Sequence, residues 1–169
     1  MAMGQDSTSA PVRPVSSVDL NRYSGKWYEI ARYPNRFQDQ CVGNTTATYN
    51  IKEPGKIEVL NECLKKDGDL NAAKGAAKVI DKSSNAKLKV RFAPSFLSVF
   101  GFVWGDYWVI DLGPNYEYSV VGDPDRKYLW ILSREPKIND PVYSEIIRRV
   151  EEQGFDSGKL IKTAQTSGG

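Results

Sequence analysis

The chain has 169 residues, of which 40% are hydrophobic and 26% charged, and this is ordinary for one globular domain. Its net charge of +2 is too small to indicate a nucleic-acid partner. It contains no histidine and only two cysteines, which excludes histidine-based catalysis and makes a metal or cofactor site unexpected.

Strand-like stretches dominate the chain. Residues 1–17 are polar and predict a flexible tail, and a short helical turn follows at residues 18–23. Eight stretches of apolar, β-branched or aromatic residues are then separated by short turns, at residues 25–33, 45–51, 56–63, 72–80, 87–92, 106–111, 116–121 and 127–134. This pattern predicts an all-β fold, an eight-stranded antiparallel up-and-down β-barrel that leaves no exposed sheet edge.

One helix is predicted after the strands. Asn139 and Pro141 are typical of a helix start, and Gly154 ends the segment. Its apolar stripe predicts packing on the outside of the barrel, through Val142, Ile146, Ile147 and Val150. Residues 159–162 suit a short last strand. The barrel domain is therefore expected at residues 18–163, with a tail at residues 164–169 and no second domain.

The two cysteines flank two predicted strands joined by a turn. Antiparallel pairing brings Cys41 and Cys63 nearly opposite each other, so a disulfide and an exported protein are one interpretation. Two buried free thiols in a reducing compartment are the alternative. Residues 1–15 show no secretory signal, so export would imply that such a signal has been removed.

Three separated motifs carry a family resemblance. Gly25 lies two residues before Trp27 at the start of the first strand, Gly105-Asp106-Tyr107 lies mid-chain, and Arg134 ends the last strand. Arg134 could stack on Trp27 as a cation–π pair. In order and spacing these motifs resemble the lipocalin family, although Gly105 replaces the usual threonine. The resemblance runs over residues 18–163 and implies that Gly25, Trp27 and Arg134 close the barrel base.

The same resemblance suggests a ligand site. Residues 27–32 and 124–134 are similar to the branch that holds apolipoprotein D, the bacterial outer-membrane lipocalin and temperature-induced lipocalins. Proteins like apolipoprotein D place ligand-contacting residues at the positions of Tyr49, Asn61 and Trp130, and strand parity also turns Trp130 inward. Trp104 and Tyr107 are weaker candidates. Plain barrel packing, or solvation for Asn61, is the alternative in each case.

The stretch at residues 92–104, which joins two predicted strands, is unusually apolar for a loop. It carries no charge, and its apolar side chains include Phe96, Leu97, Val99, Phe100, Phe102 and Val103. An apolar patch of this size marks a contact surface, so we expect it to dock on a membrane or lipid particle. A loop folded over the barrel or a homodimer contact is the alternative.

Sequestration of a small hydrophobic ligand is the function that these features favour. Candidates are a fatty acid, a lysophospholipid, a sterol or an isoprenoid such as a retinoid, bound by a monomer or homodimer without catalysis. The sequence is also compatible with two other functions. A free Cys63 in the barrel could act as the nucleophile of an isomerase, or a filled barrel could serve as a protein-interaction module.

Overall fold

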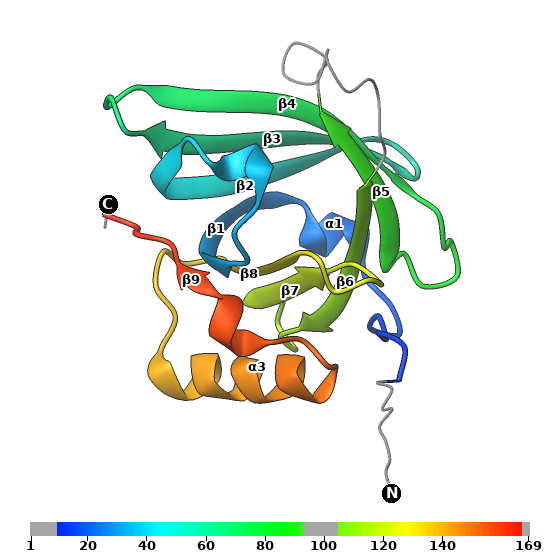
Figure 1. Ribbon diagram of the computed structural model, residues 1–169. Coiled ribbons are helices and arrows are strands. Elements are labelled where there is room, and N and C mark those ends of the chain that lie inside the picture. Colours follow the sequence, from blue (N-terminus) through cyan, green and yellow to red (C-terminus); the bar gives the residue numbers. More distant parts are fainter. Residues whose placement is uncertain (1–9, 93–104, 167–169) are drawn as a thin grey trace, which may run out of the picture.

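The computed structural model describes residues 10–92 and 105–166, which form a closed antiparallel barrel (Figure 1). Its strands are β1 (Gly25–Arg32), β2 (Cys41–Glu53), β3 (Lys56–Lys65), β4 (Leu70–Val79), β5 (Lys87–Phe92), β6 (Gly105–Leu112), β7 (Tyr118–Gly122) and β8 (Leu129–Ser133). Consecutive strands pair from β2 to β8, β8 pairs with β1, and β1 pairs with β2 to close the barrel. The predicted eight-stranded up-and-down barrel is confirmed.

Short helices and a ninth strand complete the chain. These elements are α1 (Leu20–Tyr23), η1 (Arg36–Gln38), α3 (Asp140–Glu152), η2 (Ser157–Lys159) and β9 (Ile161–Lys162). The strand β9 pairs with Ala31 and Arg32 at the end of β1, beyond the point where β1 leaves β2. Among residues 10–92 and 105–166, no helix is both long and apolar enough to cross a bilayer.

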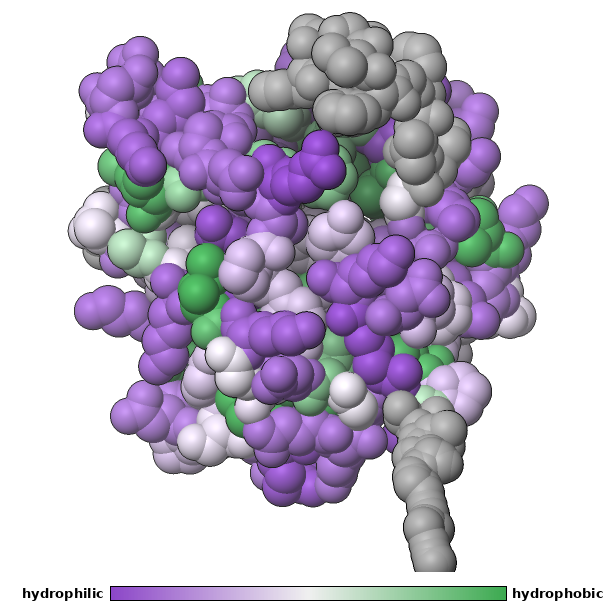
Figure 2. Space-filling model, viewed as in Figure 1, coloured by the Kyte–Doolittle hydropathy of each residue, from purple (hydrophilic) through white to green (hydrophobic). Residues whose placement is uncertain are grey.

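The alternation of side chains along the strands builds two separate hydrophobic cores. Val109 and Val121 belong to the core inside the barrel, while their neighbours Ile110 and Val120 belong to a core on the outside. Successive strand residues point to opposite faces, so each of these pairs supplies one residue to each core. The face in Figure 2 is mostly hydrophilic, and its hydrophobic side chains form small patches.

The helix α3 covers the outer core, below β7 and β8 in Figure 1. Ile146 and Val150 are fully buried against Leu129 and Ile131 of β8. This explains why β7 and β8 are apolar on both faces, unlike strands whose outer face meets water. The Asn139 side chain accepts a hydrogen bond from the amide of Val142, which caps the helix as its sequence predicts.

The two predicted tails are partly packed on the barrel. Val12 is buried in the outer core, and the amide of Val15 donates to the carbonyl of Val109 at 2.8 Å. At the other end, the carbonyl of Ala164 accepts a hydrogen bond from the amide of Asn44 at 2.7 Å. The flexible tail expected over residues 1–17 therefore does not extend through residues 12–15, because the apolar side chains of that segment find a core to join.

Candidate ligand-binding site

The closed end of the barrel is built around Arg134. Its guanidinium carbon lies 3.8 Å from the centre of the Trp27 ring, and the Trp27 indole N–H donates to the carbonyl of Tyr23 at 2.8 Å. Gly25 has a φ of +101°, which suits glycine, and a Cβ there would lie 3.4 Å from an Arg134 nitrogen. The Arg134 guanidinium also donates to four main-chain carbonyls, those of Arg22, Tyr23, Ser24 and Lys26. These contacts join α1 to β8 across the base.

A row of hydroxyl groups crosses the barrel above this base. Tyr107 donates to the hydroxyl of Tyr49 at 2.8 Å, and the hydroxyl of Tyr23 lies 2.8 Å from both Tyr107 and Ser119. Because Tyr107 has only one proton, Tyr23 must donate to Tyr107, and Ser119 must donate to Tyr23. The proton of Tyr49 then has no acceptor among the residues that the structure describes. Tyr49 therefore ends the row as a free donor.

Burial controls the ionisation of these tyrosines. It raises the pKa of Tyr23 to about 12 and also raises the pKa values of Tyr49 and Tyr107 above the ordinary range. All three remain neutral at physiological pH. A cavity of about 20 Å³ lies beside them, which is room for about one water molecule. This lower cavity is too small for a lipid.

On several strands, the inward-facing apolar and aromatic side chains become more accessible toward the mouth. On β8, Leu132 is buried near the base, whereas Trp130 is only partly buried. On β5, Leu88 is buried, while Val90 and Phe92 are partly exposed although both pack on the inner core. On β3, Ile57 and Val59 are buried and Asn61 is partly exposed, although Cys63 beyond it is buried in the disulfide. On β6, Val109 is buried and Tyr107 is partly exposed. The upper half of the barrel therefore presents accessible apolar and aromatic walls.

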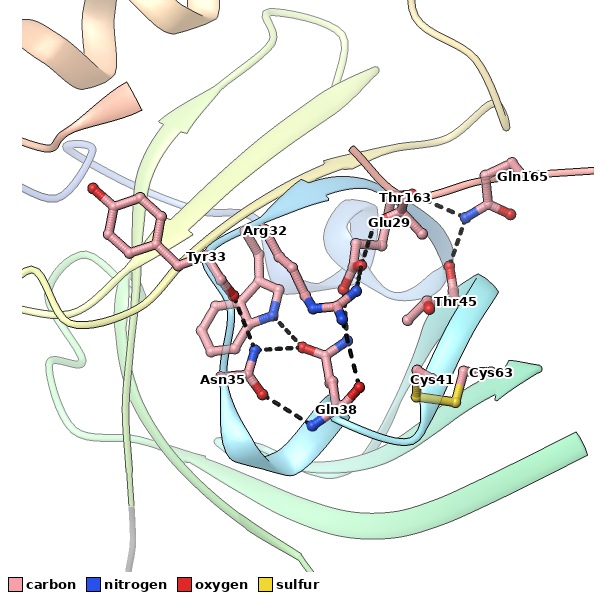
Figure 3. Close-up of polar contacts among 11 residues, drawn as sticks. Glu29, Arg32, Tyr33, Asn35, Gln38, Cys41, Thr45, Cys63, Thr163 and Gln165 are labelled. Atoms are coloured by element: carbon pink, nitrogen blue, oxygen red, sulfur yellow. Dashed lines mark hydrogen bonds and ion pairs between the residues drawn. A yellow bond between two sulfur atoms is a disulfide. The ribbon is translucent and has the colours of Figure 1, made fainter. Parts of the chain in front are cut away.

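A polar cluster lies at the mouth end of β1 (Figure 3). Glu29 and Arg32 form an ion pair at 3.0 Å, although both side chains are almost fully buried. Gln38 of η1 donates from its amide nitrogen to Glu29 at 2.8 Å, and Thr163 donates to the other carboxylate oxygen. Burial of two opposite charges requires such compensation, which these neighbours supply.

A bulge in β1 explains why two residues three apart share one face. The pairing of β1 with β8 shifts register between Glu29 and Ala31. As a result Ile30 and Ala31 both join the outer core, and Arg32 turns to the side of Glu29. Regular alternation would have placed Arg32 on the outer face. Alternation along a strand does not reveal a bulge, so the amino-acid sequence alone does not predict this cluster.

Gln38 connects the polar cluster to Trp130. Its side-chain oxygen accepts two hydrogen bonds, one from the Trp130 indole N–H at 2.9 Å and one from the side-chain nitrogen of Asn35 at 2.8 Å. Trp130 also stacks on Tyr128, with ring centroids 5.8 Å apart and an interplanar angle of 7°. The indole is therefore held in one orientation, next to its cross-strand partner Arg32.

The end of the chain closes the seam between β1 and β2. The side-chain amide of Gln165 donates to the carbonyls of Glu29 and Thr45, each at 2.9 Å (Figure 3). The amide of Thr163 donates to the carbonyl of Ile30 at 2.9 Å. Residues 163–166 thus replace the β1–β2 hydrogen bonds that are lost where the two strands part.

The predicted ligand residues fall at different depths. Tyr49 and Tyr107 belong to the hydroxyl row, Trp130 lies higher and contacts the polar cluster, and Asn61 lies on β3 opposite Ala47 and Ala73. The Asn61 side chain has no hydrogen-bond partner among residues 10–92 and 105–166. Trp104 lies outside the described residues. The predicted loop residues lie outside them as well, namely Phe96, Leu97, Val99, Phe100 and Phe102.

Cys41 and Cys63 form a disulfide at the mouth end of β2 and β3 (Figure 3), as one of the two interpretations of the sequence predicted. These are the two cysteines of the whole chain, so neither is a free thiol in this structure. No group of three or more acidic or cysteine side chains within the described residues could hold a metal ion.

Comparisons with known proteins agree with this architecture. The lipocalin-like domain family matches residues 18–165, so the chain belongs to the lipocalin family. Temperature-induced lipocalin-1 of Arabidopsis thaliana is 42% identical, over 90% of this chain and 82% of its own length. Outer membrane lipoprotein Blc of Escherichia coli is 38% identical over 93% and 88%, and apolipoprotein D of Mus musculus is 32% identical over 93% and 82%. The resemblance to this branch is confirmed.

A solved structure supports the same fold. Insecticyanin from the tobacco hornworm Manduca sexta superposes with a TM-score of 0.74 at 23% identity, covering 95% of this chain and 87% of that one. At this identity the likeness concerns the fold alone.

Proposed function

We propose that this lipocalin binds one small hydrophobic ligand in the upper half of its barrel and shields it from water. Lipocalins generally bind small hydrophobic ligands. The observation that carries the proposal is the change along the inner wall, from buried side chains at the base to partly accessible apolar ones toward the mouth. Accessible apolar walls inside a closed barrel gain free energy when a hydrocarbon chain covers them.

Three residues orient the ligand in this site. Tyr49 presents an unused hydroxyl proton from below, and Asn61 presents an amide without a partner among the described residues. Trp130 supplies a flat apolar face that Gln38 holds in place. We propose that Trp130 and Asn61 contact the ligand directly and that Tyr49 contacts its inner end. Tyr107, whose proton is already given to Tyr49, contributes ring surface.

Mass spectrometry of an organic extract, followed by titration with a lysophospholipid, a fatty acid and retinol, tests this proposal. Displacement of a fluorescent fatty-acid probe would report affinity independently of the tryptophans. We expect Trp130→Ala to weaken binding about tenfold, because it removes a large buried apolar contact. Trp108→Ala is the matched control, because Trp108 packs on the outer core. Absence of any saturable binding would contradict the proposal and favour a filled barrel that binds a partner protein.

We further propose that the mouth touches a membrane or lipid particle. Among the described residues, Phe37 is 55% exposed and Leu70 is 74% exposed, and both lie at the mouth end. The apolar sequence of residues 93–104 joins β5 to β6 at the same end. A Phe96→Ser/Phe100→Ser chain should float less with lipid vesicles than the wild type. A stable dimer without lipid would instead favour a homodimer contact.

Export and the absence of catalysis belong to the same proposal. The disulfide suits an oxidising compartment, and one relative is named an outer membrane lipoprotein. With Cys63 bonded to Cys41, the isomerase alternative lacks a thiolate nucleophile. Thiol titration of the unreduced, unfolded chain would test both points, since a free thiol would contradict them.

A further inference from the structure

The polar cluster at the mouth contains more unmet hydrogen-bonding capacity than its own residues satisfy. Four buried side-chain atoms lack a partner among the described residues, and three of them lie in this region: Arg32 Nε, Thr45 Oγ1 and Gln165 Oε1. An unpartnered buried polar atom is costly, and a well-folded protein keeps few of them. Their concentration at one place indicates a site that a polar group of a ligand completes.

The three atoms lie around the start of the β1–β2 seam. Tyr28 pairs with Thr46, so Thr45 follows beside Glu29 where the two strands part. Gln165 bridges the carbonyls of Glu29 and Thr45 through its side-chain nitrogen, while its side-chain oxygen points away from Arg32 and takes no part in the site (Figure 3). Arg32 belongs to the site through its 3.0 Å ion pair with Glu29 (Figure 3).

The two atoms that remain, Arg32 Nε and Thr45 Oγ1, differ in what they need. Arg32 Nε can only donate, while the hydroxyl of Thr45 can both donate and accept. The complementary group must therefore offer a hydrogen-bond acceptor to Arg32 and a second polar group to Thr45. An ester carbonyl next to a free hydroxyl offers both.

The charge of the cluster decides between neutral and ionised head groups. Glu29 compensates the charge of Arg32, so the buried pair is neutral overall. A carboxylate entering beside Glu29 would place a second negative charge there without a countercharge, which a buried site disfavours. An uncharged head group avoids this cost.

We propose that the Glu29–Arg32 cluster is a head-group site selective for uncharged hydroxylated esters, of the acylglycerol type, over free fatty acids. This inference rests on the proposed function, because the acyl chain would lie along the accessible apolar wall next to Trp130. Trp130 is the cross-strand partner of Arg32, so the head-group site and the apolar wall are adjacent. The ion pair sets selectivity, while Arg32 Nε and Thr45 make the contacts.

Binding of monooleoylglycerol and oleate, both as monomers at pH 8, tests the inference with two ligands that share one acyl chain. We expect wild-type protein to prefer monooleoylglycerol by at least about tenfold. Arg32→Lys keeps a cation for Glu29 but removes the Nε donor, and Thr45→Val removes the hydroxyl. Each should weaken monooleoylglycerol binding about tenfold. Thr46→Val is the matched control, because Thr46 follows on the opposite face of β2.

Glu29→Gln provides a gain of function that misfolding cannot imitate. It leaves Arg32 without its countercharge, so oleate should bind at least about tenfold more tightly than to wild type. Equal affinity for both ligands, unchanged by these substitutions, would overturn the head-group site while leaving the proposed function intact. Failure of wild-type protein to bind any hydrophobic ligand would overturn both.

Discussion

The guanidinium of Arg134 lies over the indole of Trp27 at 3.8 Å, and this pair ties the end of the last barrel strand to the first. The arginine also donates to four main-chain carbonyls, which lie in and after α1 and at the start of β1. One side chain thereby satisfies the main chain of the base and covers the largest buried ring of the inner core. The relationship explains why a strand-entry glycine, a tryptophan and a distant arginine occur together in this sequence.

Replacement of Arg134 should destabilise the barrel without changing its topology. We expect Arg134→Ala to lower the free energy of unfolding by about 2–4 kcal/mol, from the lost cation–π contact and the charged hydrogen bonds. Arg134→Lys keeps a charge over Trp27 but reaches fewer carbonyls, so it should lose about half as much. Urea unfolding followed by circular dichroism measures both. If the alanine variant unfolds at the wild-type urea concentration, the base does not depend on this side chain.

The buried tyrosines predict a loss of stability in alkali. Tyrosine ionises near pH 10 in an unfolded chain, whereas burial raises the pKa of Tyr23 to about 12 in the fold. Between these values the unfolded chain releases a proton that the folded chain retains, so the free energy of unfolding falls as pH rises from 10 to 12. The stabilisation that comes from burying neutral Tyr23 is fully present below pH 10. About 2–3 kcal/mol of it is lost as the pH rises to 12.

Absorbance of tyrosinate near 295 nm gives an independent measurement. Tyr49 and Tyr107, whose pKa values burial also raises, should ionise together with Tyr23 only when the barrel opens. Tyr23→Phe should begin less stable at pH 8, because it breaks the hydroxyl row, but should lose less between pH 10 and 12. Ionisation of all nine tyrosines in a folded barrel at pH 11 would contradict this account.

The sequence predicts the barrel well because its strands are regular over most of their length. Residues 87–92 were predicted as a strand and form β5 without change, since Leu88, Val90 and Phe92 alternate cleanly with charged residues. Strand β8 is shorter than the predicted 127–134, because Asp123 accepts the amides of Lys127 and Tyr128 into a turn. A side chain that accepts hydrogen bonds from nearby main-chain amides in this way competes with strand pairing for the same amides.

The candidate site is less predictable than the barrel. Alternation correctly assigns Trp130 to the inner face, but the Glu29–Arg32 pair depends on the bulge that separates Glu29 from Ala31. Gln165 reaches the site from a segment that composition assigns to a tail. Both features arise from long-range geometry, which a reading of local periodicity does not contain.

Reduction of the disulfide should weaken the mouth end of β2 and β3. The bond joins residues separated by 22 positions, and closing a loop of this size restricts the unfolded chain by about 3 kcal/mol. We expect Cys41→Ala/Cys63→Ala to lose about 2–4 kcal/mol of unfolding free energy while keeping the fold, because β2 and β3 pair along most of their length. Urea unfolding with and without reductant measures the difference. The double variant should be insensitive to reductant, and an insensitive wild type would show that the bond is not formed in solution.

Gln165 should control how firmly the seam between β1 and β2 is closed. Its side-chain amide donates to two carbonyls from different strands, so Gln165→Ala leaves both carbonyls without this donor. We expect a loss of about 1–2 kcal/mol and faster hydrogen exchange at the amides of Asn44 and Thr163, whose acceptors lie in the same seam. Thr166→Ala is the control, because the main-chain amide of residue 166 still donates its hydrogen bond to the Asn44 side chain. If exchange at these amides is equal in the two variants, the seam is held by the main chain alone. If hydrogen exchange is faster only in Gln165→Ala, the Gln165 side chain holds the two strands together beside the polar cluster. Release of a bound ligand should then also be faster in that variant.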